Sequence, residues 1–345
     1  MSEETIESLY ELLAEHPQLV ELFARHVKAD LDAQAAGYLK EDYRQIGLFQ
    51  RRLFKTWKAP ILRLDAMLVC SLEISSEINE EYRRGEVANP NQLNVATRLH
   101  ARAIHIAKEI SHLLKGGYAD GAMARWRSLH ETSVIASFLS EGDEQLSVRF
   151  SDYQAVERLK AAKTYVDHQD FLDFERIPPE QVAKYETEVE ELCQKYGINF
   201  RKDYGWACEK FLNPKRITFR DIEEAVKLHF LRVHYGFASK NVHSGIDSIG
   251  YKLGLSMSGE DILLAGPSNE GLIEPFQCTS LSVCQATDAL VALAPNTYRD
   301  VGSEILWQMH ESMKNEAVEA KDALLIKGKR MQARLKRRKD NGDNI

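Results

Sequence analysis

Hydrophobic residues recur every three or four positions along most of the chain before residue 244, which is the period of an α-helix. The N-terminal helices are expected over residues 3–15 and 17–36. A long helical pattern starts at residue 41, and Pro60 must kink or break it because proline lacks a backbone donor. The further helices are expected over residues 92–116, 118–140, 144–169, 178–197, 218–245, 276–294 and from about residue 296 onward. The pattern therefore predicts an all-α multi-helix bundle.

One segment interrupts this pattern. Residues 246–276 are rich in glycine and contain two prolines, and the stretch ILLAG-PSNE-GLIEPF within them could form a short β-hairpin. The segment directly follows His243, so it could fold over that residue as a lid. The fold class is therefore all-α with a small Gly-rich insertion, which is a candidate hairpin.

The loops divide the chain into three predicted parts. Residues 1–90 form an N-terminal helical module that ends in the loop EVANPNQLN. Residues 91–295 form the main helical domain, and residues 296–345 form a long C-terminal helix with a basic tail. We expect the polar site to lie in the main domain.

Composition indicates a cytoplasmic protein. The chain of 345 residues is 44% hydrophobic and 28% charged, and it has no apolar run close to the ~20 residues of a membrane span. Its acidic N-terminus does not resemble a signal peptide. The five scattered cysteines contain no C-x-x-C pair, and phosphate-loop, dinucleotide-binding and H-E-x-x-H motifs are missing. We therefore expect no cofactor and no metal.

The C-terminal segment 327–339 is strongly basic, whereas the remainder of the chain is acidic. The segment contains no acidic residue, and its eight basic residues are Lys327, Lys329, Arg330, Arg334, Lys336, Arg337, Arg338 and Lys339. Such a tail is typical of a nucleic-acid contact or of docking on an acidic surface, and it can also be a solvated helix end.

Three of the predicted helices place polar residues at a spacing of four, which aligns them on one helical face. The first pair is Arg127 and Glu131, the second group is Arg149, Tyr153 and Glu157, and the third group is Tyr235, Ser239 and His243. A buried arginine needs a carboxylate partner, which Glu131 can provide. If these helices are neighbours, the groups could converge on one pocket; each stripe could equally be a buried hydrogen-bond network.

The string RWRSLH, with four residues between Arg125 and His130, is similar to the Arg-x4–6-His pattern of the HEPN superfamily (higher eukaryotes and prokaryotes nucleotide-binding). These helical proteins include RNA-cutting toxins and phage-defence effectors. RSLHET together with the later Y-x3-S-x3-H and the Gly-rich segment resembles an uncharacterised bacterial family of helical proteins, over residues 92–295. The HEPN resemblance implies metal-independent RNA cleavage in a homodimer. His130 or His243 would then act as general base, and an arginine would stabilise the charge on the phosphate.

Three functions remain open from the sequence. The first is an RNA-directed ribonuclease or toxin-like effector, for example in phage defence, which would use Arg125, Arg127, His130, Glu131 and His243. The second is a non-catalytic sensor or adaptor that binds a small anionic ligand or a protein partner, through the pocket, the N-terminal helices or the tail. In the third, the polar stripes only stabilise the fold and the basic tail is the functional surface. Each function is compatible with a homo-oligomer and none involves a membrane.

Overall fold

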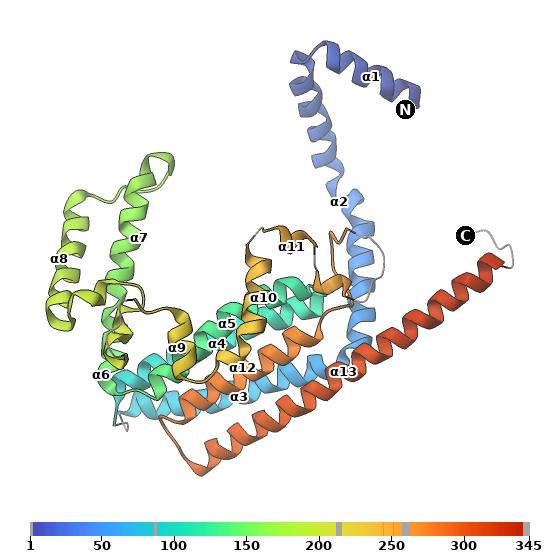
Figure 1. The fold of residues 1–345 in the computed structure, drawn as a ribbon. Helices are drawn as coiled ribbons and strands as arrows, with labels where there is room; N and C mark the ends of the chain where they lie inside the picture. Colours follow the sequence, from blue (N-terminus) through green and yellow to red (C-terminus); the bar gives the residue numbers. More distant parts are fainter. Residues whose placement is uncertain are drawn as a thin grey trace. The chain divides into compact units, whose positions relative to one another are not determined.

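The computed structural model describes residues 3–85, 88–211, 216–243, 245–250, 252–256 and 263–340, and these residues are mainly helical with no β-strand among them (Figure 1). The predicted all-α multi-helix fold is therefore confirmed. The α-helices are α1 (Glu3–Glu15), α2 (Gln18–Thr56), α3 (Lys58–Arg84), α4 (Pro90–Gly116), α5 (Ala119–Ser140), α6 (Glu144–Asp152), α7 (Gln154–His168), α8 (Pro179–Tyr196), α9 (Phe219–Ala225), α10 (Arg232–Val242), α11 (Ile246–Gly250), α12 (Ile273–Val291) and α13 (Thr297–Asp340). Short 3₁₀ helices are η1 (Gln169–Phe171), η2 (Ile198–Arg201), η3 (Gly205–Lys210), η4 (His229–Leu231) and η5 (Leu253–Leu255). No described helix combines the length and the apolar composition that a membrane crossing requires.

The chain divides into two compact units, residues 1–55 and 56–345. The first unit contains α1 and nearly all of α2, and the second contains the remaining helices. Within the second unit, α3 and α13 both pack against α12, and α12 also packs against α4 and α5. The helices on both sides of the predicted boundaries at residues 90 and 295 therefore share one bundle, and the three-part division remains a prediction.

A buried polar group joins three helices in the bundle of the second unit. Ser71 Oγ lies 2.9 Å from His100 Nε2 and 2.7 Å from Thr287 Oγ1, which connects α3, α4 and α12. All three side chains are buried. Burial lowers the pKa of His100 to about 4, because a charged imidazole would lose its hydration there. His100 is therefore neutral at physiological pH and serves the packing of the bundle.

Several helix ends follow directly from the sequence. α2 and α3 are separated next to Trp57, and Pro60 lies in the first turn of α3, where a missing backbone N–H costs little. Gly117 ends α4 in the left-handed conformation with a φ of 83°, and its N–H donates to carbonyls of the last turn. Thr218 and Asp221 cap the start of α9 reciprocally.

Two predicted helices are interrupted. The expected helix over residues 144–169 breaks at Tyr153 into α6 and α7. The expected helix over residues 218–245 is wrong as one continuous element, because Lys227 adopts the left-handed conformation with a φ of 60°. Residues 219–242 form α9, η4 and α10 instead. Both α9 and α10 pack against α5. The break at Lys227 therefore determines how the residues of α9 and α10 are placed along α5.

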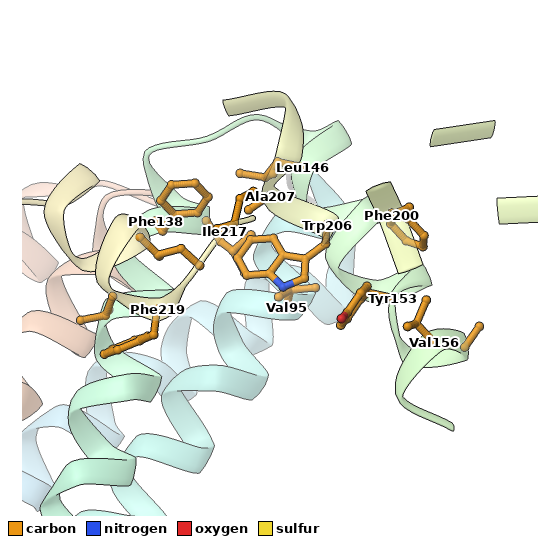
Figure 2. Packing of buried hydrophobic residues seen from close by; sticks show 14 of the residues in the cluster. Val95, Phe138, Leu146, Tyr153, Val156, Phe200, Trp206, Ala207, Ile217 and Phe219 are labelled. Atoms are coloured by element: carbon orange, nitrogen blue, oxygen red, sulfur yellow. The ribbon is translucent and has the colours of Figure 1, made fainter. Parts of the chain in front are cut away.

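A cluster of buried hydrophobic residues surrounds Trp206 in η3 (Figure 2). Its indole ring lies 5.7 Å from Phe138 of α5 and 4.9 Å from Phe150 of α6, measured between ring centroids. Gly205, the residue before Trp206, lies close to the backbone of Phe200. A Cβ atom at position 205 would be 2.1 Å from the Phe200 carbonyl oxygen. The segment between α8 and α9 is thus held tightly against α5 and α6.

The Gly-rich insertion contains no strand within its described residues, which form α11, η5 and an irregular stretch over residues 263–272. Residues 251 and 257–262, which include the start of the expected hairpin, lie outside the described residues. Its expected second arm contributes the first turn of α12 from residue 273 onward. Asp120 of α5 fixes η5 by accepting hydrogen bonds from the backbone of Leu253 and Gly254 at 3.0 and 3.3 Å.

Candidate functional site

The predicted Arg127–Glu131 pair meets Tyr235 where α10 packs on α5. The Tyr235 hydroxyl donates to Glu131 Oε1 at 2.5 Å, and Arg127 Nε donates to the same oxygen at 3.2 Å. The guanidinium of Arg127 lies 4.8 Å from the centroid of the Tyr235 ring. Burial and the contact with Glu131 raise the pKa of Tyr235 to about 12, so this residue is a neutral hydrogen-bond donor. These three predicted site residues form one partly exposed group.

His130 belongs to a second network, with Glu223 and Arg232, that the sequence did not reveal and that adjoins Tyr235, whose ring centroid lies 5.9 Å from that of His130. Its Nε2 lies 2.8 Å from Glu223 Oε1, and Arg232 Nη1 donates to the other carboxylate oxygen at 2.7 Å. Neither His130 nor Glu223 has solvent-exposed surface. Burial alone would raise the pKa of Glu223, but the hydrogen bonds from His130 and Arg232 outweigh it and lower the pKa. Since a carboxylate only accepts, the proton of this contact lies on Nε2 of His130.

The stripe of Tyr235, Ser239 and His243 does not continue as expected. Ser239 Oγ donates to the backbone oxygen of Tyr235 at 2.8 Å, within α10. His243 lies one residue past the end of α10 with an extended backbone, and its side chain is exposed. The expectation that all three side chains share a helical face is therefore wrong for His243, because α10 ends at Val242.

Arg125 and His130 lie on the same helix but have different partners. Arg125 forms an ion pair with Glu109 of α4, whereas His130 contacts Glu223 of α9. A separation of five residues corresponds to about 500° of rotation, which directs the two side chains towards different neighbouring helices. Within one copy of the chain, the residues that resemble the HEPN pattern do not form a joint site.

Arg149 and Tyr153 hold the segment between α8 and α9. Arg149 is buried, donates from Nε to the Trp206 carbonyl at 3.2 Å and is ion-paired with Glu209. The Tyr153 hydroxyl donates to the carbonyl of Lys202 at 2.7 Å. Both residues thus bond to the backbone of the irregular segment, so these predicted binding residues position it.

The basic tail forms the end of α13. The exposed side chains among its predicted residues are Lys327, Lys329, Arg330, Arg334, Lys336 and Arg337. The side chains of Arg338 and Lys339 lie outside the described part of the structure. The tail is thus available to solvent along its described length.

A cleft of about 1130 Å³ lies between α4, the α6–α7 corner, η3 and the start of α9, and we call it the α4–η3 cleft. Its aromatic lining consists of Phe150, Tyr153, Tyr204, Trp206 and Phe219. Its charged lining consists of Arg98, Arg102, Arg216, Glu157 and Asp203. Apart from Tyr153 and Glu157, which belong to the predicted stripe on residues 144–169, none of these residues was singled out from the sequence, because they come from four separate segments of the chain.

Tyr204 and Phe219 connect this cleft with the Arg127–Glu131–Tyr235 group. The Phe219 ring stacks on Tyr235 with centroids 5.4 Å apart. Burial and the nearby carboxylates of Glu131 and Asp203 raise the pKa of Tyr204. Tyr204 also has a left-handed backbone with a φ of 54°, which is strained for a bulky side chain and is enriched at functional sites. In the sequence, the only indication of the cleft residues between α8 and α9 was the mixture of aromatic and basic residues over positions 198–218.

The α4–η3 cleft, the Arg127–Glu131–Tyr235 group and the residues of the two predicted motifs all lie within residues 93–243. Residues 93–261 match the model of a protein family. The match is to a family of unknown function (DUF5677). This supports the predicted similarity to an uncharacterised family, whereas the relationship to the HEPN superfamily remains a prediction. No curated protein and no solved structure matches the chain.

The similarity to DUF5677 covers the whole cleft wall from α4 to the start of α9. Among the described residues, no group of three or more histidine, cysteine, aspartate or glutamate side chains is arranged to hold a metal ion. The cleft offers arginine side chains as donors and aromatic faces for stacking, a combination that suits an anionic ligand with a planar ring.

Proposed function

We propose that the protein is a non-catalytic sensor or adaptor that binds a small anionic ligand with a planar ring, such as a nucleotide, in the α4–η3 cleft. The main support for this proposal is the pair Arg98 and Arg102, which lie four residues apart on α4 and line the α4–η3 cleft together with its aromatic side chains. Two like charges at this spacing repel each other, and an anion bound between them would offset that repulsion.

The charges of the cleft leave these two arginines as the groups that an anion would meet. The carboxylate of Asp203 is already paired with Lys160 at 3.0 Å and faces Arg216 at 3.8 Å. Glu157 also contacts Lys160, at 3.2 Å. Arg98 donates to the neutral Asn94 at 3.0 Å. Arg102 has no ion pair with any described residue, and both arginines are exposed.

Size and lining also favour this class of ligand. Ligand sites are typically about 300–1,000 Å³, and a cleft of about 1130 Å³ is slightly above the upper end of that range. The aromatic side chains at its wall offer faces for stacking. A phosphate or carboxylate could then accept bidentate hydrogen bonds from an arginine, while the ring stacks on the aromatic wall.

RNA cleavage is less well supported by these contacts. A general base must reach the 2′-hydroxyl of a nucleotide, yet His130 is fully buried and its Nε2 is engaged by Glu223. His243 is exposed but lies beyond α10, whereas Arg125 is paired with Glu109. Metal-independent ribonuclease activity remains a prediction, and incubating the protein and its His243→Ala variant with total RNA in EDTA tests it.

The binding proposal is tested by calorimetry and thermal shift with AMP, ATP, a sugar phosphate and inorganic phosphate. We expect at least one ring-bearing anion to bind, and inorganic phosphate to bind more weakly because it cannot stack. An Arg98→Ala/Arg102→Ala variant should weaken that binding by about tenfold for each arginine, which corresponds to about 1.4 kcal/mol each.

The matched control is Lys108→Ala/Lys184→Ala, which also removes two exposed positive charges but lies outside the cleft. It should bind as the parent does. Equal loss of binding in both double variants would show that only the overall charge matters. The proposal would be refuted if none of the four anions binds at millimolar concentration, or if the Arg98/Arg102 variant binds as tightly as the parent.

A further inference from the structure

α2 in the first unit is a 39-residue helix that is almost completely solvent-exposed. Its one buried residue is Leu53, close to its end. A long isolated helix gains little stability from its own hydrogen bonds, and most helices in proteins are stabilised by packing of an apolar face. α2 has such a face, and within the described residues of its own unit nothing covers it.

The exposed face follows a repeat of seven residues. Its positions are separated alternately by four and three residues. They are occupied by Val20, Ala24, Val27, Leu31, the polar Gln34 and Tyr38. The exposed fractions of Val20, Val27, Leu31 and Tyr38 are 48%, 37%, 50% and 60%. Apolar residues at these steps form the narrow seam along which two helices pack in a coiled coil.

The charges of this unit differ between its two ends. α1 contains five glutamates and no basic residue, and it precedes the seam directly. The second half of α2, residues 37–56, contains five basic residues, which are Lys40, Arg44, Arg51, Arg52 and Lys55, against two acidic ones. The acidic α1 also disfavours an anionic membrane surface as the partner of this seam.

We propose that the seam of α2 is covered by α2 of a second copy of the chain, in antiparallel orientation. In this orientation the acidic end of each copy's first unit, at α1 and the start of α2, faces the end of the seam from which the basic second half of the other copy's α2 extends. A parallel pair would bring the two acidic ends together and the two basic halves together, which is unfavourable. The resulting interface is isologous, as in most homodimers.

The first test measures the mass of the full-length chain by light scattering during size-exclusion chromatography at 0.1 M salt. We expect twice the chain mass of 39.3 kDa. Val27→Asp/Leu31→Asp should give the monomer mass, since two carboxylates would be buried in the seam. The matched control is Leu22→Asp/Tyr43→Asp, which introduces the same charges at exposed residues of α2 outside the seam and should remain dimeric.

The second test addresses the orientation. Glu7→Lys/Glu11→Lys/Glu15→Lys should weaken dimerisation by at least tenfold, and adding Arg44→Glu/Arg51→Glu/Arg52→Glu to it should restore the dimer. A monomeric parent at 100 µM, or a control as monomeric as the seam variant, overturns the proposal. If the variant with all six substitutions does not recover the dimer, the antiparallel arrangement is overturned. Tryptophan fluorescence verifies that the second unit stays folded, because all four tryptophans lie there, and the helix content of the first unit is verified by circular dichroism.

Discussion

Replacing Glu223 by glutamine removes the negative charge from the buried network of His130 and Arg232 while keeping the side-chain volume. The bond from His130 to a charged acceptor is worth about 1.5–3 kcal/mol, and the pair with the half-exposed Arg232 about 0–1 kcal/mol. The glutamine carbonyl can still accept one weaker bond. We therefore expect Glu223→Gln to lower the free energy of unfolding by about 1–3 kcal/mol at pH 7.

Urea unfolding followed by tryptophan fluorescence measures this loss, because all four tryptophans report on the second unit and Trp126 stacks on His130 with centroids 5.2 Å apart. Glu224→Gln is the matched control. Glu224 is the next residue in α9, is exposed and forms a surface ion pair with Arg220 at 2.7 Å. Its replacement should change the free energy of unfolding by about 0.5 kcal/mol or less.

The difference between the parent and Glu223→Gln should depend on pH. The pKa of Glu223 is lowered by folding, so its charge stabilises the folded state fully above the unfolded value of about 4.5 and is lost as the pH falls towards the lower folded value. The part of the difference that comes from the Glu223 charge should shrink as the pH falls below about 4.5. A Glu223→Gln loss no larger than that of Glu224→Gln, or a difference that grows in acid, would refute this account of the network.

Three further outcomes follow from the structure. Tyr235→Phe should lower the free energy of unfolding by about 1–1.5 kcal/mol, because the ring stays stacked and only the hydrogen bond to the partly exposed Glu131 is lost; the same urea assay measures it. The ring protons of His100 should not shift in NMR spectra between pH 7 and pH 5, since burial lowers its pKa to about 4; a titration at the pKa of about 6.5 usual for histidine would contradict its burial. Cys278 and Cys284 are buried with raised pKa values, so a thiol reagent at pH 8 should leave both unmodified in the native protein and react with all five cysteines after unfolding; rapid reaction of either would show that α12 is accessible.

The local structure of the chain could be predicted well from its sequence. The all-α class, the break near Pro60 and the end of α4 at Gly117 rest on backbone effects that proline and glycine exert wherever they occur. The pairing of Arg127 with Glu131 followed from their spacing on one helix. These features depend on residues within a turn or two of each other. The hydrophobic periodicity and the positions of proline and glycine were therefore sufficient to predict them.

The candidate site was decided by the tertiary structure. Glu223 reaches His130 across 93 positions of sequence, and the left-handed Lys227, which nothing in its residue type foretold, separates α9 from α10. α10 then ends at Val242, which leaves His243 off the stripe that its spacing had predicted. The cleft joins residues of α4, the α6–α7 corner, η3 and α9, whose adjacency depends on how their apolar faces pack. Sequence periodicity reports which face of a helix is apolar, but the partner of that face is chosen by the packing of the whole bundle, and the site follows from that choice.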